Sequence, residues 1–155
     1  ARAKADGQEL ADRLLRIGDE DAAAFTGFGA ALKLPRETEK EQADRKAAIR
    51  AAARVAAEVP LRCVEACLDV VADAEMLAGR SNVNASSDLH VAALLAKAAA
   101  RGAAANVRVN LPSVGDEAWA AEASARVDDL LAAIATLAAS THAVVASGES
   151  RPPVG

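Results

Sequence analysis

Amide and carboxylate side chains are concentrated in one short segment, Ser81–His90, between two apolar, alanine-rich stretches. Its polar residues include Asn82, Asn84, Ser87 and Asp88. A connection between two helices needs only a turn residue and a cap, so this concentration of hydrogen-bonding groups indicates a ligand site. For each of these residues taken alone, the alternative is a local structural role in a turn or a helix cap. Asparagines suit a turn, and a serine or an aspartate suits the first turn of a helix.

A second candidate for chemistry is Asp21, which falls on an apolar helical stripe. The stripe consists of residues at helical spacing, namely Leu10, Leu14, Ile17, Phe25, Phe28 and Leu32. A carboxylate on a buried face is unfavourable unless it is paired, hydrogen-bonded or protonated, and burial raises the pKa of carboxyl groups in general. That property suits a general acid or base near neutral pH. The alternative is that Asp21 pairs with a neighbouring helix for structural reasons.

Asn106 and Asn110 place two more amides on the helix that follows the polar segment. Asp88 and Asn106 are 18 positions apart, which is about five helical turns, so they share one face of that helix. They would lie about 27 Å apart and cannot act on one reacting atom. Three roles are open for the two asparagines: contact with a distant part of a ligand, contact between subunits, or hydrogen bonding to buried backbone.

Basic residues also recur at one-turn spacing, at Lys46, Arg50 and Arg54. Such a stripe is usually a solvated face, and the functional alternative is an anion-binding edge. Cys63 and Cys67 are one turn apart without the further ligands of a zinc site, which favours two small buried residues. The chain contains no P-loop, dinucleotide fingerprint, nucleophile elbow or histidine-rich metal motif. The expected chemistry is therefore acid–base work by carboxylates and amides, without a metal or cofactor.

Composition indicates one globular helical domain. The 155 residues are 52% hydrophobic and 26% charged, and alanine is the commonest residue. Aromatic residues make up only 2%, which favours closely approaching helices over a sheet. The net charge of −4 and the scarcity of aromatic residues argue against a nucleic-acid partner. The segment 130–148 has no charged residue, but its Ala, Ser and Thr content favours a buried helix over a membrane span.

Proline, glycine and asparagine residues divide the chain into five predicted helices, at about 3–32, 38–58, 60–79, 86–111 and 115–146. Thr38 and Glu41 form a capping box at the start of the second helix. Pro60 and Pro112 are expected to end the second and fourth helices. Short connections favour an antiparallel bundle over residues 1–146, with a flexible tail at 147–155.

An ordered series of these residues resembles the formiminotetrahydrofolate cyclodeaminase and methenyltetrahydrofolate cyclohydrolase family. The resemblance runs from about Leu10 to the last helix and rests on Asp21–Phe25, Leu34–Thr38, Arg45, Val59–Leu61, Asn82–Asp88 and Asn106–Leu111. One departure is that the family usually begins with a Pro-Gly-Gly-Gly-Ser type segment, which this sequence lacks. We therefore expect further residues before Ala1.

The resemblance implies an all-helical, dimeric enzyme acting on one-carbon derivatives of tetrahydrofolate. The residue usage, with two cysteines that form no zinc set, separately fits a reducing cytoplasm. A cyclodeaminase closes 5-formiminotetrahydrofolate to 5,10-methenyltetrahydrofolate with loss of ammonia, and a cyclohydrolase opens the methenyl compound with water to 10-formyltetrahydrofolate. Asp21 and Asp88 match the family's characteristic acids and are expected to transfer protons. Asn82 and Asn84, with Ser87, are expected to orient the pterin or the one-carbon unit. These residues leave the choice between the two activities open.

Charge alone suggests a partner for the basic residues. Arg50 and Arg54, with Lys46, Lys33 and Arg36, are expected to meet the glutamate tail of the folate. The alternative to an enzyme is a helical dimerisation or scaffold module that kept the fold without the reaction.

Overall fold

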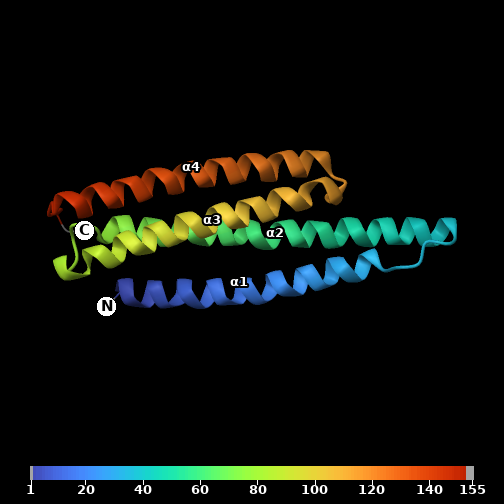
Figure 1. Ribbon diagram of the computed structural model, residues 1–155, viewed down its shortest axis with the longest axis horizontal. Helices are drawn as coiled ribbons and strands as arrows, with labels where there is room; N and C mark the ends of the chain where they lie inside the picture. The colour runs from blue at the N-terminus through green and yellow to red at the C-terminus, as the bar shows by residue number, and fades with distance from the viewer. Residues whose placement is uncertain (1, 153–155) are drawn as a thin grey trace.

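The computed structural model describes residues 2–152, which form four long helices and one short 3-10 helix (Figure 1). They are α1 (Arg2–Leu32), α2 (Glu39–Leu77), η1 (Val83–Ala85), α3 (Ser86–Val114) and α4 (Glu117–Ser147). No strand occurs among the described residues. Consecutive long helices run in opposite directions. The predicted all-α class is confirmed, and the predicted number of five helices was too high by one.

The error in helix number comes from Pro60, which lies inside α2 instead of ending it. Proline has no N–H, so the carbonyl oxygen of Ala56 loses the donor that a helix normally supplies. Asn110 Nδ2 on α3 donates to that carbonyl at 3.0 Å. Because a neighbouring helix satisfies the freed carbonyl, the two helices predicted at 38–58 and 60–79 form one continuous helix.

The remaining helix ends agree well with sequence signals. Thr38 Oγ1 accepts from the backbone N–H of Glu41 at 3.2 Å, and Glu41 accepts from the N–H of Thr38 at 2.9 Å, which confirms the capping box. The backbone N–H groups of Thr38 and Glu37 hold the pKa of Glu41 below its usual value. α3 passes the predicted end at Pro112 and stops before Gly115, whose φ of 70° is left-handed. Asp116 then caps α4 by accepting from the N–H of Trp119 at 3.0 Å.

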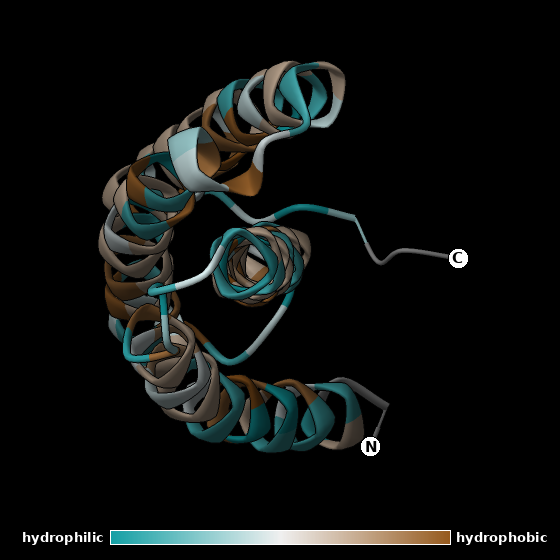
Figure 2. Cartoon of the chain, turned by 90° about the vertical axis from the view of Figure 1, so that its right-hand side faces the viewer, coloured by the Kyte–Doolittle hydropathy of each residue, from teal (hydrophilic) through white to brown (hydrophobic). Residues whose placement is uncertain are grey.

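α2 is the central helix of the molecule. Viewed nearly along its axis, the other helices curve around one side of α2 and leave the opposite side without a covering helix (Figure 2). Small residues allow this close packing, since Ala53, Ala57, Ala93, Ala100 and Ala104 are fully buried. The prediction of closely approaching, alanine-rich helices is confirmed.

A groove runs between α1 and α3 and has α2 as its floor. Both helices pack on α2, but within the described residues their Cα atoms stay more than 8 Å apart. Side chains of all three helices line cavities along this groove. The fold therefore places α1 and α3 as the two walls of a site on α2.

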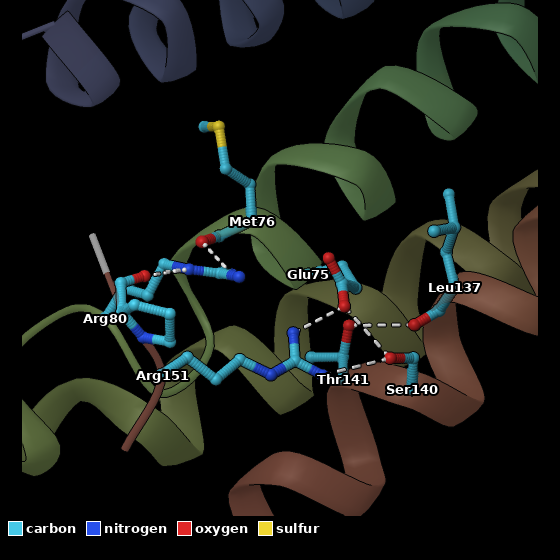
Figure 3. Close-up of polar contacts among 8 residues, drawn as sticks. Glu75, Met76, Arg80, Leu137, Ser140, Thr141 and Arg151 are labelled. Atoms are coloured by element: carbon cyan, nitrogen blue, oxygen red, sulfur yellow. Dashed lines mark hydrogen bonds and ion pairs between the residues drawn. The ribbon is translucent and has the colours of Figure 1, made fainter. Parts of the chain in front are cut away.

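The described part of the predicted flexible tail lies against the end of α2 (Figure 3). Arg151 Nη1 is 2.5 Å from a carboxylate oxygen of Glu75, and the Arg151 N–H donates to the carbonyl of Gly79 at 2.8 Å. Arg80 Nε donates to the carbonyl of Pro152 at 2.8 Å. The tail is thus tethered to the bundle as far as Pro152, and residues 153–155 lie outside the described residues.

Among the described helices, α4 alone is long and apolar enough to cross a membrane by length and composition. Its apolar face, with Val127, Leu130 and Ile134, belongs to the buried core that also contains residues of α2 and α3. In this structure α4 has the position of a bundle helix.

Candidate active site

Asp21 lies on the α1 wall of the groove and is half-buried. Its Oδ1 accepts a hydrogen bond from Asn106 Nδ2 on the α3 wall at 3.2 Å. The two residues line both of the adjoining cavities, which have volumes of about 280 and 390 Å³. The carboxylate is therefore held by one amide and open to a ligand on either side.

A second amide fixes the orientation of the first. Asn110 Nδ2 points toward the backbone oxygens of Ala56 and Asn106, at 3.0 and 2.9 Å, and lies 3.3 Å from Asn106 Oδ1. Because three acceptors surround this nitrogen, the Asn106 side chain presents its oxygen to Asn110 and its Nδ2 to Asp21. Pro60 thus sets up the site indirectly, by freeing the carbonyl that anchors Asn110. Hydrogen bonding to buried backbone was one of the three roles left open for this residue.

The sequence placed Asp21 on a single buried stripe, and the structure corrects this. The residues of α1 that are buried against α2 recur every seven positions, at Ile17, Ala24 and Ala31. Asp21 belongs to the neighbouring row with Leu14 and Phe28, all half-buried at the groove. Phe25 is 79% exposed, although its type and spacing had suggested a core residue. It lines the cavity that also contains Asp21 and Asn110, so its ring is available to a ligand.

Cys63 is a further residue of the site that the sequence did not identify. It is half-buried on α2 and lines the same cavity as Asp21 and Asn106, whereas Cys67 is buried as expected. A hydrogen bond with Cys67 lowers the pKa of the Cys63 thiol to about 7, although burial and the nearby Asp21 carboxylate act in the opposite direction. The only sequence signal for this position is its one-turn spacing from Pro60 and Cys67.

Asn82, Asn84, Ser87 and Asp88 lie exposed at the other end of α3. Asn82 Oδ1 accepts from the backbone N–H of Asn84 at 3.0 Å, so Asn82 has the local turn role that was its alternative. Asp88 is in the first turn of α3. Since Asp88 and Asn106 are separated by about 27 Å of helix, a single chain does not bring Asp88 to Asp21.

The basic stripe divides into two parts. Arg54 is engaged within the protein: its Nε is 2.6 Å from Glu58, its Nη1 is 3.6 Å from Asp116, and its guanidinium lies 3.8 Å from the centre of the Trp119 ring. Arg50, one turn earlier, lines a separate cavity of about 490 Å³ at the end of the bundle. The earlier part of the stripe, Lys46 and Arg50, therefore faces a space that a ligand can enter.

A family profile and several known proteins match this chain. The profile of the family described as Formiminotransferase-cyclodeaminase matches residues 1–129. The chain belongs to this family. The resemblance seen in the sequence is thereby confirmed.

The relatives of this chain include proteins with two different names, a cyclohydrolase and a formimidoyltransferase-cyclodeaminase. The chain is 38% identical over 113 residues to the methenyltetrahydrofolate cyclohydrolase of Methylorubrum extorquens, covering 73% of this chain and 54% of that protein. It is 35% identical over 120 residues to the formimidoyltransferase-cyclodeaminase of Gallus gallus, covering 77% of this chain and 22% of that protein. The chain thus spans about half the length of the first relative and about a fifth of the second.

The fold is also that of a solved family member. The formiminotetrahydrofolate cyclodeaminase of Thermotoga maritima superimposes with a TM-score of 0.78 at 24% identity, covering 90% of this chain and 66% of that one. Within residues 2–152, no group of three or more His, Cys, Asp or Glu side chains is arranged to hold a metal ion.

Proposed function

We propose that this chain is a folate one-carbon enzyme that acts at the carbon joined to N5 and N10 of tetrahydrofolate, as a cyclodeaminase or as a methenyltetrahydrofolate cyclohydrolase. The observation that carries the proposal is the Asp21 carboxylate in the groove, held at 3.2 Å by Asn106. Family membership supplies the substrate class. The proposed chemistry uses no metal or organic cofactor.

In the cyclodeaminase reaction, N10 attacks the formimino carbon and gives a tetrahedral carbon bonded to N5, N10 and an amino group. The N10 proton passes to that amino nitrogen. We assign to Asp21, in its protonated form, the second proton that the nitrogen needs to leave as ammonia. The C–N bond then breaks, and the methenyl cation and the Asp21 carboxylate remain, so protons and charge balance.

In the cyclohydrolase reaction, water attacks the methenyl carbon, and the Asp21 carboxylate accepts a proton from it. The same proton then passes to N5 as the C–N5 bond breaks, and the hydroxyl proton of the tetrahedral carbon is released to solvent as the formyl carbonyl forms. One carboxyl group thus serves first as base and then as acid. The Asn106 amide supports both reactions, because its hydrogen bond keeps the carboxylate at the groove wall.

A homodimer would bring the remaining predicted site residues to the groove, namely Asn82, Asn84, Ser87 and Asp88. One chain leaves them about 27 Å from Asp21, so we propose that they face the groove of a second copy. Apolar residues beside them support an interface, since Val83, Val91, Leu94 and Leu95 are 73%, 53%, 52% and 66% exposed. The free thiols of Cys63 and Cys67 agree with the cytoplasm as the proposed location.

The methenyl absorbance tests the proposed function directly. The purified protein is incubated with 5,10-methenyltetrahydrofolate and, separately, with 5-formiminotetrahydrofolate. Loss of absorbance in the first identifies a cyclohydrolase, and gain in the second a cyclodeaminase. Asp21→Asn should abolish the change, whereas Asp19→Asn, an exposed neighbour on the same helix, should keep it. No change above background with either substrate would instead favour the scaffold alternative.

A further inference from the structure

The chain contains only two histidines, and the fold brings them together. His90 lies near the start of α3 and His142 near the end of α4, at the same end of the bundle (Figure 1). They are 52 positions apart in sequence, and His142 Nδ1 lies 3.1 Å from His90 Nε2. The ring centres are 4.6 Å apart. Only the folded chain therefore presents two imidazoles to one point in space.

The histidine pair is accessible and is not engaged by other side chains. His142 is exposed and His90 is half-buried. Among the residues that the structure describes, neither ring makes another side-chain hydrogen bond or an ion pair. In the contact between the rings, one nitrogen donates its hydrogen and the other accepts it. A solute that binds imidazole can therefore reach the pair without displacing another protein group.

The separation of the two facing nitrogens fits a shared metal ion. Imidazole nitrogens bind Zn²⁺ at about 2.0–2.1 Å. Two nitrogens at that distance from one ion are about 3.0 Å apart for a right angle at the metal and about 3.4 Å apart for a tetrahedral angle. The observed 3.1 Å lies between these values. Rotation of the two side chains can thus replace the hydrogen between the rings by an ion.

The replacement balances in protons. Both facing nitrogens must offer a lone pair to the metal, so the hydrogen that stands between them has to leave its position. It moves to the outer nitrogen of its own ring by exchange with water. Each imidazole remains neutral and keeps one hydrogen, and binding therefore needs no oxidant, reductant or net loss of a proton.

The ligand type selects the class of ion. Imidazole suits Cu²⁺, Ni²⁺ and Zn²⁺, whereas Mg²⁺ and Ca²⁺ prefer oxygen ligands. Within residues 2–152 no group of three or more His, Cys, Asp or Glu side chains could hold an ion. The pair therefore supplies two ligands, and water fills the other positions. For such a site the general order of affinities places Cu²⁺ first.

We propose that His90 and His142 bind a divalent transition-metal ion that joins the start of α3 to the end of α4. Unfolding separates the two ligands, so the ion binds the folded chain in preference to the unfolded chain and stabilises it. The site is distinct from the Asp21 groove, since His90 and Asn106 are separated by about 24 Å of helix. The ion is structural and takes no part in the proposed folate chemistry.

Calorimetric titration with NiCl₂ tests the site on the full chain without an affinity tag. We expect one ion per chain and at least tenfold weaker binding in His90→Asn and in His142→Asn. Cys63→Ser/Cys67→Ser is the control, because thiols are the other side chains that bind such ions well, and it should bind like the wild type. Absence of binding to the wild type, binding that survives both histidine substitutions, or binding lost in the cysteine variant would overturn the proposal.

Thermal melts test the stabilisation. At a Ni²⁺ concentration about a hundred times the Kd, the Tm of the wild type should rise by about 5–10 °C, and that of His90→Asn/His142→Asn by less than about 1 °C. Binding without a rise in Tm would refute the link between α3 and α4.

Electron paramagnetic resonance of the wild type loaded with Cu²⁺ needs no variant. The spectrum should show hyperfine coupling to two imidazole nitrogens, and coupling to one nitrogen, or a sulfur ligand, would contradict the shared site.

Discussion

The position of Asp21 depends on a chain of hydrogen bonds that begins at a proline. Pro60 frees the Ala56 carbonyl, Asn110 donates to it, and Asn106 is thereby oriented toward Asp21. Asp21 could be selected from the sequence because a carboxylate among apolar residues is conspicuous and because the family series contains it. The role of Asn110 could not, since its acceptor lies on another helix and is free only because α2 continues through Pro60.

A double-mutant cycle tests this link. Asn110→Ala leaves the Ala56 carbonyl without a donor, so the free energy of unfolding should fall by about 1–3 kcal/mol. Pro60→Ala supplies a backbone N–H to the same carbonyl. We therefore expect Pro60→Ala to be more favourable by about 1 kcal/mol in the Asn110→Ala background than in the wild type. Urea denaturation measures all four proteins, and strict additivity would disprove the link.

Phe25 offers a second test at the scale of a single residue. Because the side chain is 79% exposed, Phe25→Ala should change the free energy of unfolding by no more than about 0.5 kcal/mol. It should nevertheless raise KM for the folate, because the ring lines the cavity beside Asp21. Leu15→Ala is the matched control, since Leu15 is 72% exposed on the same helix and does not line that cavity. An unchanged KM for Phe25→Ala would show that the Phe25 ring does not contribute to folate binding.

At the scale of elements, periodicity and caps predicted the residues of the four long helices but not η1. Tertiary contacts explain the points that local signals could not give. Pro60 reads as a helix end, because the sequence does not reveal that α3 will supply the missing donor. The tail after Ser147 reads as loose, because Glu75, the carboxylate that receives Arg151, is 76 residues away. Both contacts join positions that are distant in sequence, and the local sequence around Pro60 or after Ser147 does not reveal them.

The tail contact predicts a dependence of stability on pH. The hydrogen bond from Arg151, with further support from Ser140 and Arg80, holds the pKa of Glu75 below its usual value of 4.5. A depressed folded-state pKa stabilises the fold above pH 4.5, and this contribution is lost as the pH falls through the folded-state pKa. Arg151→Gln should therefore lower the free energy of unfolding by about 1–2 kcal/mol at pH 7. Urea denaturation at pH 7 and pH 3 should show the difference from wild type shrinking at pH 3, and a constant difference would contradict it.

At the scale of the whole molecule, two segments of the family series, Asn82–Asp88 and Asn106–Leu111, lie toward opposite ends of α3. Asp21 lies in the groove between α1 and α3, beside the C-terminal half of α3, and the Asn82–Asp88 segment is exposed at the other end of that helix. The family resemblance led us to expect proton transfer from both acids, and the sequence did not reveal that Asp21 lies beside the C-terminal half of α3, far from Asp88. If both acids serve one reaction, a second copy must bring them together.

Mixing two inactive variants decides whether the acids come from different copies. Asp21→Asn and Asp88→Asn should each lose activity as pure homodimers, with light scattering confirming the dimer. In a mixed dimer, one groove receives Asp21 from the first subunit and Asp88 from the second, and both are intact. Random exchange of equal amounts should therefore restore about a quarter of the wild-type activity, because half of the dimers are mixed and each has one complete site. If both acids acted within one chain, every site in the mixture would lack one of them. Activity that stays at the level of the separate variants would thus exclude the shared site and leave Asp88 to its local role in the first turn of α3.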